Sequence, residues 1–119
     1  MLGTFVLCNG YYDAVFSKAQ QRTALLVAEM DAIFKQYDAV LMPVSPGTAF
    51  SIGQKDKDPI AMYLADIYTV LANLAGVAAI SLPLFSHSNN MPFGLQVMAN
   101  KRDELTLLTV SDMLLTKHK

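Results

Sequence analysis

Apolar residues recur at three- and four-residue steps in the first third of the chain, and this spacing predicts a long amphipathic helix over Tyr12–Gln36. The positions with this spacing are Val15, Phe16, Ala19, Leu26, Met30, Ile33, Phe34 and Tyr37. A shorter apolar piece, Leu2–Cys8, precedes the helix, and Gly10 separates the two. The predicted helix therefore needs another element against which to bury one side.

A short apolar run follows this helix. Asp38–Met42 is closed by proline, and we interpret it as a buried strand. The Pro-x-x-Pro-Gly pattern of Pro43–Gly47 indicates that the chain leaves the sheet there. Charged residues around a glycine predict a solvated loop over Ser51–Lys57.

The dipeptide Asp58-Pro59 is typical of a helix start, because aspartate caps free amides and proline loses no hydrogen bond at the first helical position. We expect this helix to run to about Leu71, and the apolar segment up to Gly76 either continues it or forms a turn. Two strands follow, Ala79–Phe85 and Phe93–Ala99, and the polar turn between them favours antiparallel pairing. A last helix is predicted over Arg102–Lys117.

This order of elements predicts an α/β fold in which helices pack on a small mixed β-sheet. The length of 119 residues predicts one domain over 1–119. Hydrophobic residues make up 53% of the chain and charged residues only 16%, against about a quarter in an average globular protein. Some apolar surface is therefore expected to need a partner.

Several function classes are disfavoured by the composition. The longest apolar region, Leu71–Phe85, is broken by polar residues, so no membrane role is expected and the cytoplasm is the default location. One cysteine, Cys8, excludes an internal disulfide, and two histidines do not make a zinc cluster. A net charge of −1 without a basic stripe argues against this segment alone binding the phosphate backbone of a nucleic acid.

Asp66 is the strongest candidate for chemistry. It lies in an almost uncharged helical stretch, and helical spacing places Thr69 and Asn73 on its side. A carboxylate buried there would need a partner, because an unpaired buried charge costs several kcal/mol, and a substrate ammonium group would serve. Alternatively, Asp66 faces water or accepts hydrogen bonds from neighbouring amides.

Other reactive residue types have structural interpretations. Cys8 and the serines Ser45 and Ser81 lack the neighbours that activate a nucleophile, and His87 belongs to a polar turn. Gln96 is interpreted as an alternating strand residue. The expected roles of three further residues are a contact at a helix end, a turn and a strand position; these are Asn73, Gly76 and Ser81.

The run Thr69–Gly76, followed by Ala79–Pro83 and Pro92–Gln96, resembles the C-terminal third of amidase signature enzymes. Within that family the chain is similar to the A subunits of glutamyl-tRNA(Gln) or aspartyl-tRNA(Asn) amidotransferases. Upstream segments extend the resemblance to Met1 and onward to about Leu108; they are Met1–Leu7, Gly10–Ala14, Lys18–Gln20 and Asp58–Tyr63. The family usually has proline where this chain has Leu71 and Ala78.

The resemblance implies a severed part of a larger glutaminase. Asp66 aligns with the aspartate that recognises the α-amino group of glutamine, which makes it the expected substrate-binding residue. The family's serine nucleophile, lysine base and carboxylate-binding arginine belong to earlier segments, so no catalytic residue is expected here. The implied partners are the B and C subunits, with tRNA bound through the complex and ATP and Mg used on the B subunit.

Two alternatives stay open at this stage. The shared elements Asn73–Gly76 and Gly94–Gln96 also fit another amidase signature hydrolase that acts on simple amides. The second alternative is a free-standing α/β domain without catalytic activity. Such a domain is expected to self-associate, because a part of a larger sheet should retain an unpaired edge or an uncovered apolar face.

Overall fold

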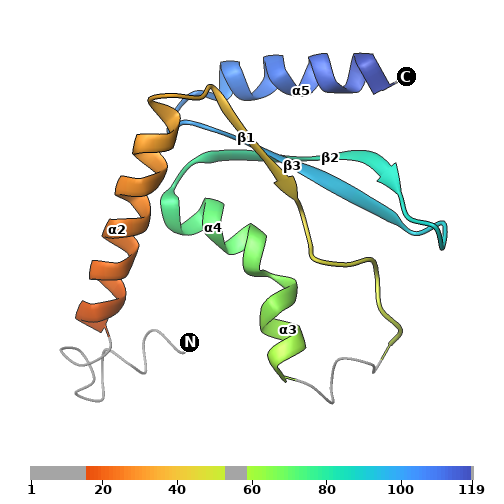
Figure 1. Ribbon diagram of the computed structural model, residues 1–119, viewed down its shortest axis with the longest axis horizontal. Helices are drawn as coiled ribbons and strands as arrows, with labels where there is room; N and C mark the ends of the chain where they lie inside the picture. Colours follow the sequence, from red (N-terminus) through yellow and green to blue (C-terminus); the bar gives the residue numbers. More distant parts are fainter. Residues whose placement is uncertain (1–15, 53–58, 119) are drawn as a thin grey trace.

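The computed structural model describes residues 16–52 and 59–118 (Figure 1). The described elements are α2 (Ser17–Phe34), β1 (Ala39–Pro43), α3 (Pro59–Ala65), α4 (Ile67–Ala75), β2 (Ala78–Ser86), β3 (Pro92–Ala99) and α5 (Glu104–His118). The expected apolar piece Leu2–Cys8 and the expected cap at Asp58 lie outside the described residues. No helix among those described is long and apolar enough to cross a membrane.

The described strands form one three-stranded sheet in the order β1-β3-β2. Helices pack on a small sheet, as predicted. Both pairings of the described strands are antiparallel, however, and not mixed as expected. The predicted hairpin of β2 and β3 is confirmed, and β1 returns to the far side of β3 with Leu41 opposite Val97. β3 is therefore central, and β1 and β2 are the edges.

Alternation along β3 divides the interior into two layers. Val97 and Ala99 pack with Leu82 of β2 and Leu107 of α5 on one face of the sheet. Met98 faces the opposite side. The buried partners of Met98 come from α2 and α4, and they are Met30, Ala72 and Ala75. Figure 1 shows α5 along one face of the sheet and α4 beneath the other.

Helix α5 starts two residues later than the sequence pattern predicts. Arg102 has a left-handed backbone with φ of 58°, so the chain turns there instead of entering the helix. The next residue, Asp103, then accepts a hydrogen bond at Oδ1 from the backbone N–H of Thr106 at 3.3 Å. This is the usual bond of a helix cap, and it places the helix start after Asp103.

The helix expected over residues 59–71 is two helices that meet at Asp66. The N–H of Asp66 donates to the Tyr63 carbonyl at 3.3 Å, a bond to the third preceding residue in place of the α-helical fourth. The backbone at Asp66 has φ of −100° and ψ of 2°, outside the helical range. Of the two alternatives for the segment after Leu71, continuation of the helix is observed, to Ala75.

Strand β1 is less buried than the sequence predicts. Its apolar run agrees with the predicted strand, but the order of the sheet makes it an edge, and the Leu41 side chain is 49% exposed. Pro43 ends the strand, as the missing N–H of proline allows at an edge.

The chain leaves much apolar surface open. Its radius of gyration is 17.3 Å, whereas a compact domain of this length has about 13.5 Å. α3 and α4 carry a row of large apolar side chains that are 45–80% exposed, namely Ile60, Tyr63, Leu64, Ile67, Val70 and Leu74. The expected uncovered apolar face is thus present in the described part of the chain.

Helix α4 ends at a glycine with a left-handed backbone. Gly76 has φ of 66°, and its N–H and that of Val77 both donate to the Ala72 carbonyl, at 3.0 and 3.2 Å. These bonds close the helix and turn the chain into β2. The turn expected at Gly76 is confirmed, and the left-handed conformation is the reason for glycine there.

We expect Gly76→Ala to lower the free energy of unfolding by about 1–2 kcal/mol, because a Cβ disfavours the left-handed conformation. A Cβ would meet no atom within 4 Å at Gly76, so crowding would not contribute. Gly47→Ala is the matched control, since its Cβ is equally free and Gly47 is not left-handed. Urea unfolding followed by circular dichroism measures both, and equal losses would contradict the backbone explanation.

Candidate functional site

The candidate site is an open groove of about 620 Å³ at one end of the sheet. Three segments line it: residues 44–50 after β1, residues 64–66 at the junction of α3 and α4, and residues 92–94 at the start of β3. The segments are distant in sequence and meet because β1 and β3 are paired. Most of the lining side chains are apolar.

Asp66 is the only charged residue that lines this groove within the part of the chain that the structure describes. It is exposed, so the burial penalty expected from its apolar sequence surroundings does not arise. Of the two structural interpretations, the solvent-facing one agrees with this placement. Solvent reaches the carboxylate from the groove, where a cationic group of a ligand can approach it.

The carboxylate of Asp66 is not used in capping α4. Asp66 occupies the N-cap position, but its side chain makes no capping hydrogen bond. Among the described residues, none forms an ion pair or a side-chain hydrogen bond with its carboxylate oxygens. They therefore remain available to accept hydrogen bonds from a ligand in the groove.

Thr69 and Asn73 lie along the start of α4, as helical spacing predicts, but both bind backbone. Thr69 Oγ1 donates to the Asp66 carbonyl at 3.0 Å, and Asn73 Nδ2 donates to the Thr69 carbonyl at 2.9 Å. The Asp66 carbonyl also accepts the N–H of Val70 at 3.0 Å. The polar residues near Asp66 thus reinforce the first turns of α4 and leave its carboxylate unoccupied.

Gln96 has a contact that sequence reasoning did not identify. It alternates in β3 as predicted, but it is only 5% exposed, and its Nε2 donates to the backbone carbonyl of Tyr68 at 3.2 Å. The signal in the sequence is a large polar residue inside an otherwise apolar strand, which requires a buried partner.

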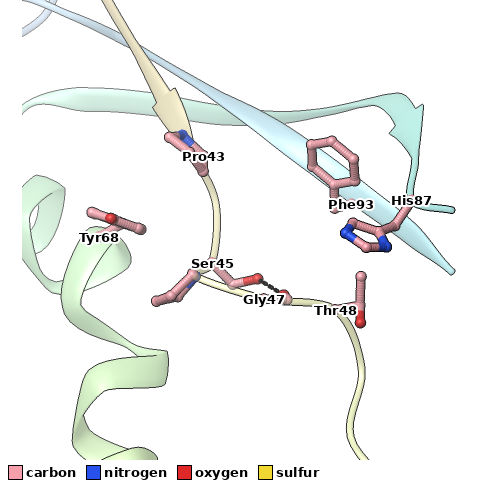
Figure 2. Close-up of a pocket in the computed structure, with 8 residues that line it drawn as sticks. Pro43, Ser45, Gly47, Thr48, Tyr68, His87 and Phe93 are labelled. Carbon is pink, nitrogen blue, oxygen red and sulfur yellow. Dashed lines mark hydrogen bonds between the residues drawn. The ribbon is translucent and has the colours of Figure 1, made fainter. Parts of the chain in front are cut away.

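A second cavity of about 420 Å³ lies beside the first and shares residues 45–48 and Phe93 with it. Figure 2 shows Tyr68 and His87 on opposite sides of the loop that carries Ser45. The Ser45 hydroxyl donates to the Gly47 carbonyl, and His87 Nδ1 lies 3.1 Å from Ser88 Oγ. The Ser45 contact involves no base, and the His87–Ser88 contact joins exposed neighbouring residues in the turn between β2 and β3.

The structural interpretations of the other polar residues agree with the geometry. His87 is exposed in the turn between β2 and β3, and Ser81 lies on β2 opposite Gln96. Within residues 16–52 and 59–118, no group of three or more His, Cys, Asp or Glu side chains is placed to hold a metal ion. Cys8 lies outside the described residues.

The amino-acid sequence of the chain is similar to those of amidases. The amidase family model matches residues 1–108. The chain is 48% identical over 111 residues to the A subunit of the glutamyl-tRNA(Gln) amidotransferase of Brevibacillus brevis, and 46% identical over 110 residues to that of Acidobacterium capsulatum. These matches cover 93% and 92% of the chain, but only 23% of each relative. The chain therefore spans about a quarter of the length of these relatives.

Two solved structures show the same arrangement of elements. The A subunit of the Thermotoga maritima glutamyl-tRNA(Gln) amidotransferase is 50% identical with a TM-score of 0.72, over 85% of this chain and 22% of that one. A 6-aminohexanoate cyclic dimer hydrolase is 24% identical with a TM-score of 0.70, over 81% of this chain and 23% of that one. The second likeness concerns the fold alone.

Gly94 provides a test of the close packing beside the groove. A Cβ there would lie 2.6 Å from Ser81 Oγ and 3.0 Å from Val44 Cγ2. We expect Gly94→Ala to lower the free energy of unfolding by about 1–2 kcal/mol, because such overpacking forces neighbours to shift. Adding Ser81→Ala should restore part of this loss, as measured by urea unfolding of the single and double variants. An equal cost of Gly94→Ala with and without Ser81 would contradict contact with that hydroxyl.

Proposed function

The chain belongs to the amidase family, and we propose that it forms the C-terminal part of the glutaminase (A) subunit of a tRNA-dependent amidotransferase. The observation that carries the proposal is the identity of nearly one half to subunits of that name over more than nine tenths of the chain. The solved hydrolase has the same fold at half that identity. In addition, the Asp66 carboxylate lines a groove in which it could bind the α-ammonium group of glutamine.

In this proposal the complete subunit hydrolyses glutamine by acyl transfer. A serine attacks the side-chain amide, its carbon–nitrogen bond breaks, and ammonia leaves; water then cleaves the acyl-serine ester to give glutamate. The serine, its lysine base and the donors that stabilise the oxyanion would come from parts of the subunit beyond these residues. The ammonia would pass to a B subunit that uses ATP and Mg to activate glutamyl-tRNA(Gln) or aspartyl-tRNA(Asn), in a cytoplasmic complex with a C subunit.

The part of this chain would be to hold the amino acid. The Asp66 carboxylate would accept hydrogen bonds from the α-ammonium group, beside the mainly apolar side chains that line the groove. An exposed ion pair is worth only about 1 kcal/mol or less, and it strengthens when a closed site removes water. Asp66 therefore contributes most when the rest of the subunit covers the groove.

We expect Asp66→Asn in the full-length protein, assembled with its partners, to raise the KM for glutamine about tenfold or more. The substitution keeps the shape but removes the charge that pairs with the ammonium group, and tenfold corresponds to about 1.4 kcal/mol of lost binding. Amidation of tRNA with free ammonia should be unchanged, because that reaction bypasses the glutamine site.

Asp112→Asn is the matched control for this experiment. Asp112 is an exposed carboxylate on α5, which packs on the opposite face of the sheet from α4. The control should leave both reactions unchanged. If Asp66→Asn also leaves glutamine-dependent amidation unchanged, Asp66 does not bind glutamine. Activity of the unmodified full-length protein on simple amides, without use of glutamine, would favour another amidase hydrolase instead.

The isolated 119-residue chain is expected to release no ammonia from glutamine and to self-associate. The exposed apolar row on α3 and α4 gives the physical reason for association, since contact between copies would remove it from water. Light scattering after size-exclusion chromatography measures the self-association, and binding of an apolar-surface dye measures the exposed apolar surface. A monomer that binds little dye, or measurable glutaminase activity, would contradict this expectation.

A further inference from the structure

Gln96 differs from the other buried polar side chain of the described residues. Ser111 Oγ donates to the Leu107 carbonyl of its own helix at 2.7 Å. Gln96, in contrast, connects two elements, because it lies in β3 and donates to the Tyr68 carbonyl of α4 at 3.2 Å. This bond joins the central strand of the sheet to the first turn of the helix that begins after Asp66.

The two ends of α4 are held differently. Ala72 and Ala75, in its second half, are buried against Met98 and α2. In its first half, Ile67 and Val70 are 51% and 45% exposed, so apolar packing does little to fix that turn. The Gln96 bond therefore holds the end of α4 that apolar packing leaves open.

The position of this bond relates it to the groove. Tyr68, whose carbonyl accepts the bond, follows Asp66 by two residues, and Gln96 follows Gly94 of the groove wall by two residues. Strand β3 thus supplies both one wall of the groove and the tether for the turn that presents Asp66. The break between α3 and α4 removes the support that a continuous helix would give Asp66.

We propose that Gln96 is a positioning residue for glutamine binding, which it supports by fixing the first turn of α4 and hence the place of the Asp66 carboxylate across the groove. This inference rests on the proposed function. Gln96 does not touch the ligand; its amide acts only through the Tyr68 carbonyl. The burial of Gln96 favours this role, because the bond is partly shielded from competition by water.

The test is Gln96→Met in the full-length protein assembled with its partners. Methionine fills a similar volume but cannot donate to the Tyr68 carbonyl. We expect the KM for glutamine to rise between about twofold and tenfold, the range for loss of one hydrogen bond, with ammonia-dependent kcat unchanged. Ser111→Ala is the matched control, since it removes a buried hydroxyl bond on α5 and should leave the KM for glutamine unchanged.

A double variant separates positioning from a general structural effect. If Gln96 acts through Asp66, Gln96→Met should raise the KM no further in a protein that already carries Asp66→Asn. An equal increase in both backgrounds, or no increase in the background with Asp66 intact, would overturn the inference. If Asp66→Asn alone has no effect, the proposed function fails instead.

A second variant covers the case in which Gln96→Met does not fold. Gln96→Asn keeps the amide but is one methylene shorter, so it cannot span the same distance to the Tyr68 carbonyl. It should reproduce the rise in KM with the same lack of effect in the Asp66→Asn background. An unchanged KM in a folded Gln96→Asn protein would overturn the inference.

Discussion

Burial of β3 on both faces is the constraint on which the described structure depends. In the buried second half of this strand, successive residues pack toward opposite layers: Val97 and Ala99 toward α5, and Met98 toward α2 and α4. The three residues are 0% exposed, so none has room to move to the other face. A shift of one residue in register would exchange both sets of contacts, and the pairing of both edge strands is fixed by the same alternation.

The site inherits its geometry from that strand. Residues 92–94 line the groove, and the register with β1 brings the loop after Pro43 to the same end of the sheet. The alanines of α4 pack on Met98, which places the start of this helix, and hence Asp66, beside the groove. The end of α3 lines the groove as well, through Leu64 and Ala65. A rigid sheet and a helix start that is held by one buried amide are together suited to present a carboxylate at a fixed place.

The sequence determines the type and order of the described elements well, because apolar spacing and turn residues are local signals. The two strands of the hairpin and the amphipathic helix were predictable in this way. The antiparallel order β1-β3-β2 was not, since nothing in residues 39–43 states which side of the hairpin they join. The break at Asp66 was also hidden, because no glycine or proline lies near it and only three-dimensional packing decides where the helix bends.

Asp66 itself could be proposed from sequence, because one carboxylate in an apolar run needs an explanation. Its exposure was one of the alternatives but could not be decided from sequence, since it depends on the helix break and on an apolar face that the described residues leave uncovered. The bond from Gln96 to Tyr68 joins residues 28 positions apart and is visible only in the fold. Sequence pattern therefore located the polar residues of interest, and tertiary structure assigned their contacts.

The pairing of β1 with β3 has a consequence for how the chain folds. The hairpin of β2 and β3 closes over a short turn, but Ala39 pairs with Ala99 across about half of the chain. Closing so long a loop costs more chain entropy than closing a hairpin, and contacts of this kind slow folding. The groove therefore requires this long-range pairing as well as the hairpin, because the loop after Pro43 forms one of its walls.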